Sequence, residues 1–172
     1  MRRSILLIAA VLLLAACSSG KSAPTTDGKG PVTPASSTSD ATGVFKALAA
    51  AVPTAKLTWT ATAVNDPNHL LGRPGQYTSK IAFADSQIPS KDTELGGTQL
   101  YKAGDLQLGG SVEVFPSLED AAARAKYVTA VTKSVQAFAE YDYQHGDVVL
   151  RLSHLLTPDQ AAKYKAALGK LS

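Results

Sequence analysis

Cysteine is almost absent from this chain, because Cys17 is the only one among 172 residues. A single thiol cannot form an intramolecular disulfide and supplies at most one thiolate to a metal site. Its position favours a different role, since it ends an apolar run close to the N-terminus. We therefore expect the fold to be stabilised by its hydrophobic core alone.

The chain also lacks an apolar run long enough to span a bilayer. Residues 5–16 are uninterrupted apolar residues that follow the cationic pair Arg2-Arg3, whereas a spanning helix needs roughly 20 of them. A short apolar segment with a cationic start and a small-residue end is typical of a secretory signal peptide, which we predict over residues 1–16. Arg2-Arg3 leave twin-arginine export open beside general secretion.

Leu14-Ala15-Ala16-Cys17 resembles the lipobox of bacterial lipoproteins. The resemblance implies cleavage between Ala16 and Cys17, a diacylglycerol on the cysteine sulfur, and anchoring at the outer face of the cell membrane. Each buried CH₂ contributes about 0.8 kcal/mol to membrane binding, and two acyl chains hold a protein that one chain would hold only marginally. The membrane is therefore the first expected partner, reached through the lipid on Cys17.

Clustered positive charge is missing as well. Seventeen Lys and Arg against fourteen Asp and Glu give a formal charge of +3, and loss of Arg2 and Arg3 with the signal peptide leaves fifteen against fourteen. No run of basic residues forms the patch that phosphate binding requires. We therefore expect no nucleic-acid partner.

Residues 18–42 contain almost no large apolar side chain and are rich in Ser, Thr, Pro and Gly. Such a segment buries too little apolar surface to offset its ordering entropy. We predict that residues 17–42 comprise the lipidated Cys17 and a disordered tether, on the order of 25–30 Å from end to end. Glycosylation of its Ser and Thr residues is left open. The extracytoplasmic domain is then expected over residues 43–172.

Two periodicities organise the rest of the chain. Apolar residues recur at helical spacing over 43–52, 117–135 and 157–171, and they alternate over 56–64, 77–85, 110–115 and 147–153. Strands grouped beside helices predict an α+β fold, with a single mostly antiparallel sheet of four to five strands and helices packed on one face.

His145 is the histidine with the most acidic surroundings, in the stretch YDYQHGD beside Asp142. A general base or a metal site needs such neighbours. However, the chain has no H-x-x-x-H spacing, and Gly146 favours a turn that enters a strand. We therefore predict no catalytic residue, no metal ligand and no cofactor. An envelope hydrolase that uses His145 and a nearby carboxylate is an alternative function.

The stretch NDPNHLLGRPGQY, residues 65–77, joins two predicted strands. One interpretation is a long connection whose Leu70 and Leu71 pack under the sheet. The other is a ligand or partner loop that presents His69, Arg73 and Tyr77 from a rigid base, with Arg73 contacting an anionic group.

The stretches DPNHLLGRPGQYTSK, GGSVEVF and VVLRLSHLLTPDQAAKY are similar to small uncharacterised lipoproteins of high-GC Gram-positive bacteria. This resemblance implies no activity. The features together predict a membrane-anchored cell-envelope lipoprotein that is a non-enzymatic binding or accessory module for an envelope protein or a cell-wall component. A carrier of a lipid or other apolar ligand is a further alternative. It requires a sizeable apolar cavity, whereas the many alanines of the predicted helices favour close packing.

Overall fold

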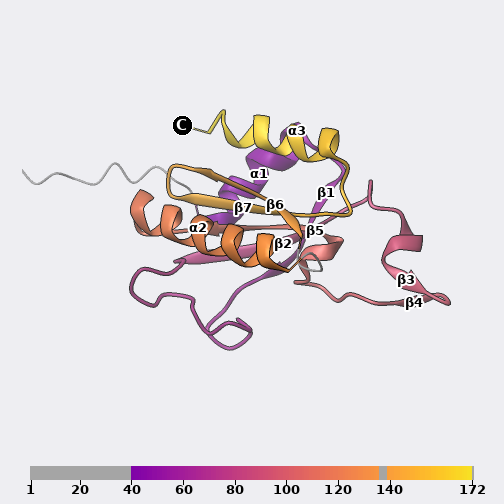
Figure 1. Cartoon of the computed structure of the whole chain (residues 1–172), viewed down its shortest axis with the longest axis horizontal. Helices are drawn as coiled ribbons and strands as arrows, with labels where there is room; N and C mark the ends of the chain where they lie inside the picture. The colour runs from indigo at the N-terminus through magenta and orange to yellow at the C-terminus, as the bar shows by residue number, and fades with distance from the viewer. Residues whose placement is uncertain (1–39, 136–138, 172) are drawn as a thin grey trace, which may run out of the picture. The chain divides into compact units, whose positions relative to one another are not determined.

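The computed structural model describes residues 40–135 and 139–171, so the predicted signal peptide, Cys17 and nearly all of the tether lie outside the described residues. The elements, in chain order, are α1 (Ala41–Ala51), β1 (Ala55–Thr60), β2 (Ser79–Asp85), η1 (Ser90–Asp92), β3 (Glu94–Leu95), β4 (Thr98–Gln99), η2 (Leu106–Leu108), β5 (Gly109–Val114), α2 (Leu118–Ser134), β6 (Glu140–His145), β7 (Val148–Ser153) and α3 (Pro158–Leu168). Figure 1 shows their arrangement.

The main sheet has five strands in the order β1-β2-β5-β7-β6, and every neighbouring pair is antiparallel. Because β7 lies between β5 and β6, those two strands run parallel to each other without pairing, and α2 connects them. β3 and β4 form a separate hairpin that projects to one side (Figure 1). The predicted α+β class with one antiparallel main sheet is thus confirmed.

Side-chain caps begin the helices where the sequence predicts them. The Thr157 hydroxyl accepts from the backbone N–H of Gln160, whose side chain accepts from the Thr157 N–H, which completes a capping box. At the start of α2 the Ser117 hydroxyl accepts from the N–H of Asp120 and donates to the carboxylate of the same residue. No helix within residues 40–135 and 139–171 is both long and apolar enough to cross a membrane.

Helix α1 begins at Ala41, two residues before the expected start of the domain. Ala41 is fully buried, and its N–H donates to the hydroxyl of Ser79 at the start of β2, while Asp40 caps the helix by accepting from Gly43. The folded domain therefore includes residues that composition alone had assigned to the tether.

Helices α1 and α3 cover one face of the sheet and form the main hydrophobic core with it (Figure 1). Phe83 on β2 lies at its centre, with ring centroids 5.3 Å from Phe45 of α1 and 5.5 Å from Tyr164 of α3. The ring of Phe83 lies over Gly110, its cross-strand partner, where an added Cβ would come within 2.6 Å of the ring. Glycine at this position lets the aromatic cluster close against the sheet.

Helix α2 corrects the prediction that the helices share one face. It packs on the opposite face, where Ala121 is buried with Tyr77, Phe115 and Val149, and where Arg124 binds Glu113. Polar residues that alternate with core residues along a strand are typical of a side that faces solvent. They instead pair with one another beneath α2, and this neutralisation allows a second layer to cover them.

Candidate functional site

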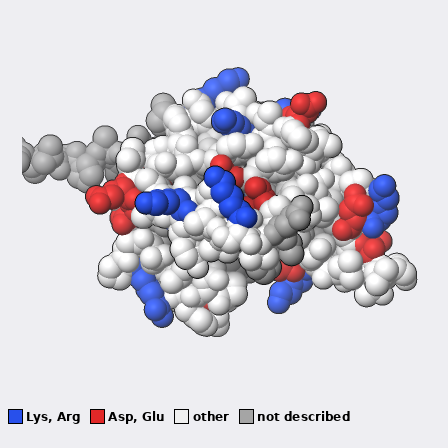
Figure 2. Space-filling model, viewed as in Figure 1, with Lys and Arg blue, Asp and Glu red and all other residues white. Residues whose placement is uncertain are grey.

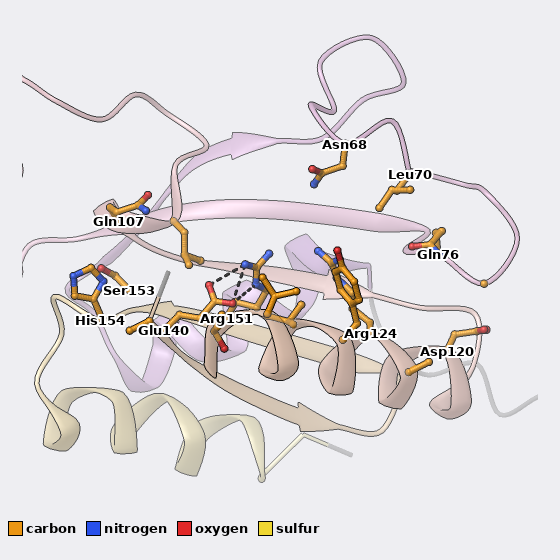
Figure 3. A pocket seen from close by; sticks show the side chains of 18 residues that line it. Asn68, Leu70, Gln76, Gln107, Asp120, Arg124, Glu140, Arg151, Ser153 and His154 are labelled. Atoms are coloured by element: carbon orange, nitrogen blue, oxygen red, sulfur yellow. Dashed lines mark hydrogen bonds and ion pairs between the residues drawn. The ribbon is translucent and has the colours of Figure 1, made fainter. Parts of the chain in front are cut away.

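A cavity of about 750 Å³ lies on the α2 face of the sheet, within the size range of small-molecule sites. Its walls come from α2, from the 65–77 loop and from the segment that contains η2, while its floor comes from β6 and β7 (Figure 3). The lining residues are Asn68, Leu70, Gly75, Gln76, Leu106, Gln107, Asp120, Ala123, Arg124, Tyr127, Val128, Val131, Thr132, Ala139, Glu140, Arg151, Ser153 and His154.

One side of α2 forms the longest wall of this cavity. Asp120, Arg124, Tyr127 and Val131 recur at intervals of three or four residues, which places them along one stripe of the helix. The side chain of Tyr127 is 62 % exposed and that of Val131 is 38 % exposed. Tyr127 and Val131 are exposed because they line the cavity and do not pack into the core.

A buried carboxylate, Asp66, holds the 65–77 loop in place. It accepts the backbone N–H groups of Leu70 and Leu71 at 2.8 and 2.9 Å and the hydroxyl of Tyr77 at 2.8 Å. Burial pushes the pKa of Asp66 upward, but these donors and the N–H of Asn68 outweigh burial, so the pKa lies below its usual range. The ionised carboxylate of Asp66 thus holds the loop that forms this wall of the cavity.

None of the three predicted loop residues, His69, Arg73 and Tyr77, lines the cavity. Tyr77 is fully buried, and burial together with its bond to Asp66 raises the pKa of its hydroxyl. His69 and Arg73 are exposed and do not line the cavity, which the loop reaches through Asn68, Leu70 and Gln76 instead. Leu70 and Leu71 pack against the smaller core cluster. This packing agrees with the first interpretation of the loop, and a ligand or partner role for His69, Arg73 and Tyr77 stays a prediction.

Glu113 on β5 is the centre of the charge network beneath the cavity. Its fully buried carboxylate lies 2.9 Å from Nζ of Lys80, 2.8 Å from Nε of Arg124 and 3.6 Å from Nη1 of Arg151. Burial alone raises the pKa of a carboxyl, but the three cations lower that of Glu113 to about 2. Glu113 therefore stays ionised over the whole physiological range.

Glu140 on β6 has the opposite character. Nε and Nη2 of Arg151 donate to it at 2.8 to 3.0 Å, yet the same guanidinium also faces Asp142, whose Oδ1 lies 4.0 Å from Nε. Burial raises the pKa of Glu140 to about 7 despite Arg151, and Asp142 adds to the rise. Burial also raises the pKa of Asp142. Two carboxyls thus share one cation, and the pair readily takes up a proton.

His145 does not meet Asp142. The two residues are three apart on β6 and face opposite sides of the sheet, and the Nε2 atom of His145 lies 2.9 Å from the carbonyl oxygen of Leu171. The stretch predicted as a turn is strand β6, with the turn itself at Gly146 (φ +55°). Across the described ranges, no three His, Cys, Asp or Glu side chains are grouped to hold a metal.

No sequence pattern pointed to four residues of this site, which are Glu113, Arg124, Glu140 and Arg151. Alternation placed Glu113 and Arg151 on the polar side of their predicted strands, which is typical of a solvent-facing position, and Glu140 lay outside every predicted strand. The signs of the charges were the available indication of buried pairing. Lys80, Glu113 and Arg151 each occupy a polar position in one of three predicted strands, and they neutralise one another once paired. On the face drawn in Figure 2, acidic and basic side chains are interspersed.

Neither a known protein family, nor a curated protein, nor a solved structure matches the chain.

Proposed function

We propose that this chain is a membrane-anchored lipoprotein of the cell envelope, held at the outer face of the membrane by a diacylglycerol on Cys17, and that its domain is a non-enzymatic binding module. The lipobox residues 14–17 support the anchor. The observation that carries the binding function is the cavity, whose walls come from three segments far apart in sequence. An envelope protein or a cell-wall component is the partner that such a module serves.

The titratable groups of the cavity favour binding over hydrolysis. Glu113 is enclosed by three cations, and Glu140 accepts two N–H groups of Arg151. General-base or nucleophilic catalysis needs an acid or base that can reach a reacting atom. His145, the residue on which the hydrolase alternative depends, contacts the C-terminal segment on the other side of the sheet.

The size of the cavity favours a carrier of small ligands as a second candidate. At about 750 Å³ it meets the volume that the carrier hypothesis requires, despite the alanine-rich helices. Its lining is mixed, because Arg124, Glu140 and Arg151 lie among the apolar residues. A ligand that fills it must therefore offer polar groups as well as apolar surface.

The binding function is tested by photocrosslinking in intact cells. A photoreactive amino acid replaces Val131, which faces the cavity, or Lys163, which is exposed on α3 far from the lining residues. We expect a discrete adduct at position 131 and none at position 163, measured by mass spectrometry of the purified protein. The same adducts at both positions, or none at position 131, contradict the assignment.

The anchor is tested separately with Cys17→Ser. We expect this variant to leave the membrane fraction and to lose the mass of the diacylglycerol. Unchanged fractionation means that the sulfur carries no anchor.

A further inference from the structure

Two arginines present their charge to the cavity, Arg124 from α2 and Arg151 from β7 (Figure 3). The side chains of Arg124 and Arg151 are 12 % and 20 % exposed, against 0 % and 2 % for those of their partners Glu113 and Glu140. Each guanidinium therefore covers the carboxylate it binds. The cavity meets the positive member of each pair first.

The two pairs differ in how firmly the arginine is held. Arg124 donates Nε and Nη2 to Glu113, a carboxylate that stays ionised and is also bound by Lys80. Arg151 is bound by Glu140, which lies beside Asp142 and loses its charge near neutral pH. Protonation of Glu140 weakens its hold on Arg151, and the guanidinium can then accept another anion.

Apolar surface lies directly beside these guanidinium groups. Tyr127, Val128 and Val131 line the α2 wall, and Leu70 and Leu106 come from the two other walls. The guanidinium carbon of Arg124 also lies 5.9 Å from the ring centre of Tyr127. The cavity thus offers a cationic floor with apolar sides.

We propose that the cavity takes an amphipathic anion, a carboxylate or phosphate group joined to an apolar chain or ring, which binds Arg151 and displaces the carboxylate of Glu140. Arginine suits this exchange because its fork of N–H donors matches both oxyanions in bidentate geometry. The inference rests on the proposed function, since it names the ligand of the same cavity.

The exchange balances in charge and in protons. The ligand brings one negative group to Arg151, and the displaced carboxylate of Glu140 takes up one proton from solvent. The surrounding charged and titratable groups are Asp142 on β6, Arg151 on β7, His154 after β7, Glu113 on β5, Lys80 on β2 and Arg124 on α2. Binding should therefore consume a proton above pH 7, where Glu140 is ionised before the ligand binds, and should tighten as the pH falls towards about 7.

The test compares four ten-carbon probes on the full chain bearing Cys17→Ser, so that no detergent competes for the cavity. Decanoate and decyl phosphate carry the two anionic groups, decanamide is uncharged and decylamine is cationic. We expect one of the anions to bind about tenfold more tightly than decanamide by isothermal titration calorimetry, and decylamine to bind most weakly. The preferred anion identifies the head group.

Variants separate recognition from mere structural support. Glu140→Gln should still bind the anion but should lose both the proton uptake, read from titrations in buffers of different ionisation enthalpy, and the pH dependence. Arg151→Gln should bind decanoate no better than decanamide. Arg73→Gln removes an arginine outside the cavity and should change nothing. His154→Gln removes the histidine among the lining residues, and the pH dependence should persist.

Where the probes bind, two outcomes overturn the inference. One is decanamide or decylamine binding as tightly as the anions. The other is an affinity that stays constant or rises as the pH is raised from 6 to 8. If none of the four probes binds while position 131 still acquires its adduct, the ligand is not an amphipathic anion but the cavity remains the binding site. If the adduct is also absent, the proposed function fails with the inference.

Discussion

The two faces of the central sheet are built from alternating residues of the same strands, yet they have little else in common. Ile81, Val112 and Leu150 form one cross-strand row, and all three are buried against α1 and α3. One step along the strands, Lys80 and Glu113 form a row that is also buried, but as an ion pair on the α2 face. Side chains are therefore buried on both faces, by apolar packing in the first row and by charge pairing in the second.

The contrast indicates which face supplies stability and which is available for a site. Apolar burial is favourable by roughly 25 cal/mol per Å², and the α1/α3 face is the continuous core. Buried ion pairs roughly repay their own desolvation, so they add little net stability. The α2 face has only a smaller apolar cluster, and it combines that cluster with ion pairs and the cavity. Its charges are nevertheless fixed, since removing one leaves its partners unpaired.

The largest effect is expected on the apolar face. Phe83→Ala removes the ring that contacts Phe45 and Tyr164 and leaves a cavity over Gly110. We expect a loss of about 4 kcal/mol in the free energy of unfolding, measured by urea denaturation. Leu57→Ala, on β1 at a position 42 % exposed, is the matched control and should cost under about 1 kcal/mol. Equal losses would mean that the aromatic cluster is not the centre of the core.

The next largest loss in the free energy of unfolding is expected from a substitution on the charged face. Glu113→Gln leaves Lys80, Arg124 and Arg151 without their shared carboxylate, and we expect a loss of about 3 kcal/mol at pH 7. Because the folded pKa of about 2 lies below the unfolded value of 4.5, this stability is present above pH 4.5 and is lost as the pH falls through about 2. The difference from the wild type should shrink over that range in urea titrations.

Glu119→Gln makes the same chemical change at an exposed position in the first turn of α2. It should alter the unfolding free energy by less than about 0.5 kcal/mol at every pH. A Glu113 variant that behaves like this control would show that the network is not buried in solution.

The apolar face could be predicted from the sequence, whereas the charged face could not. Alternation assigned Ile81, Val112 and Leu150 to the core because a strand repeats every two residues, a purely local property. The pairing of Lys80 with Glu113 joins residues 33 positions apart, and no local pattern encodes it. A charged residue looks solvent-facing until its partner is known. The cavity likewise joins α2, the 65–77 loop and strands β6 and β7, so its lining depends on long-range packing that no local pattern encodes.

The smallest effect distinguishes the two carboxylates of the charged face by the sign of their pH dependence. The pKa of Glu140 is about 7 in the folded state and 4.5 as its ordinary value, so its contribution to stability is fully present below pH 4.5 and is lost as the pH rises through about 7, opposite to Glu113. We expect Glu140→Gln to remove about 1 kcal/mol of this decline, a figure reduced for screening by solvent. Thermal unfolding of both proteins between pH 4.5 and 8 measures it, with Glu94→Gln as the exposed control. Parallel curves for wild type and variant would mean that Arg151 holds Glu140 as firmly as Lys80 and Arg124 hold Glu113, and the charged face would then have no displaceable carboxylate.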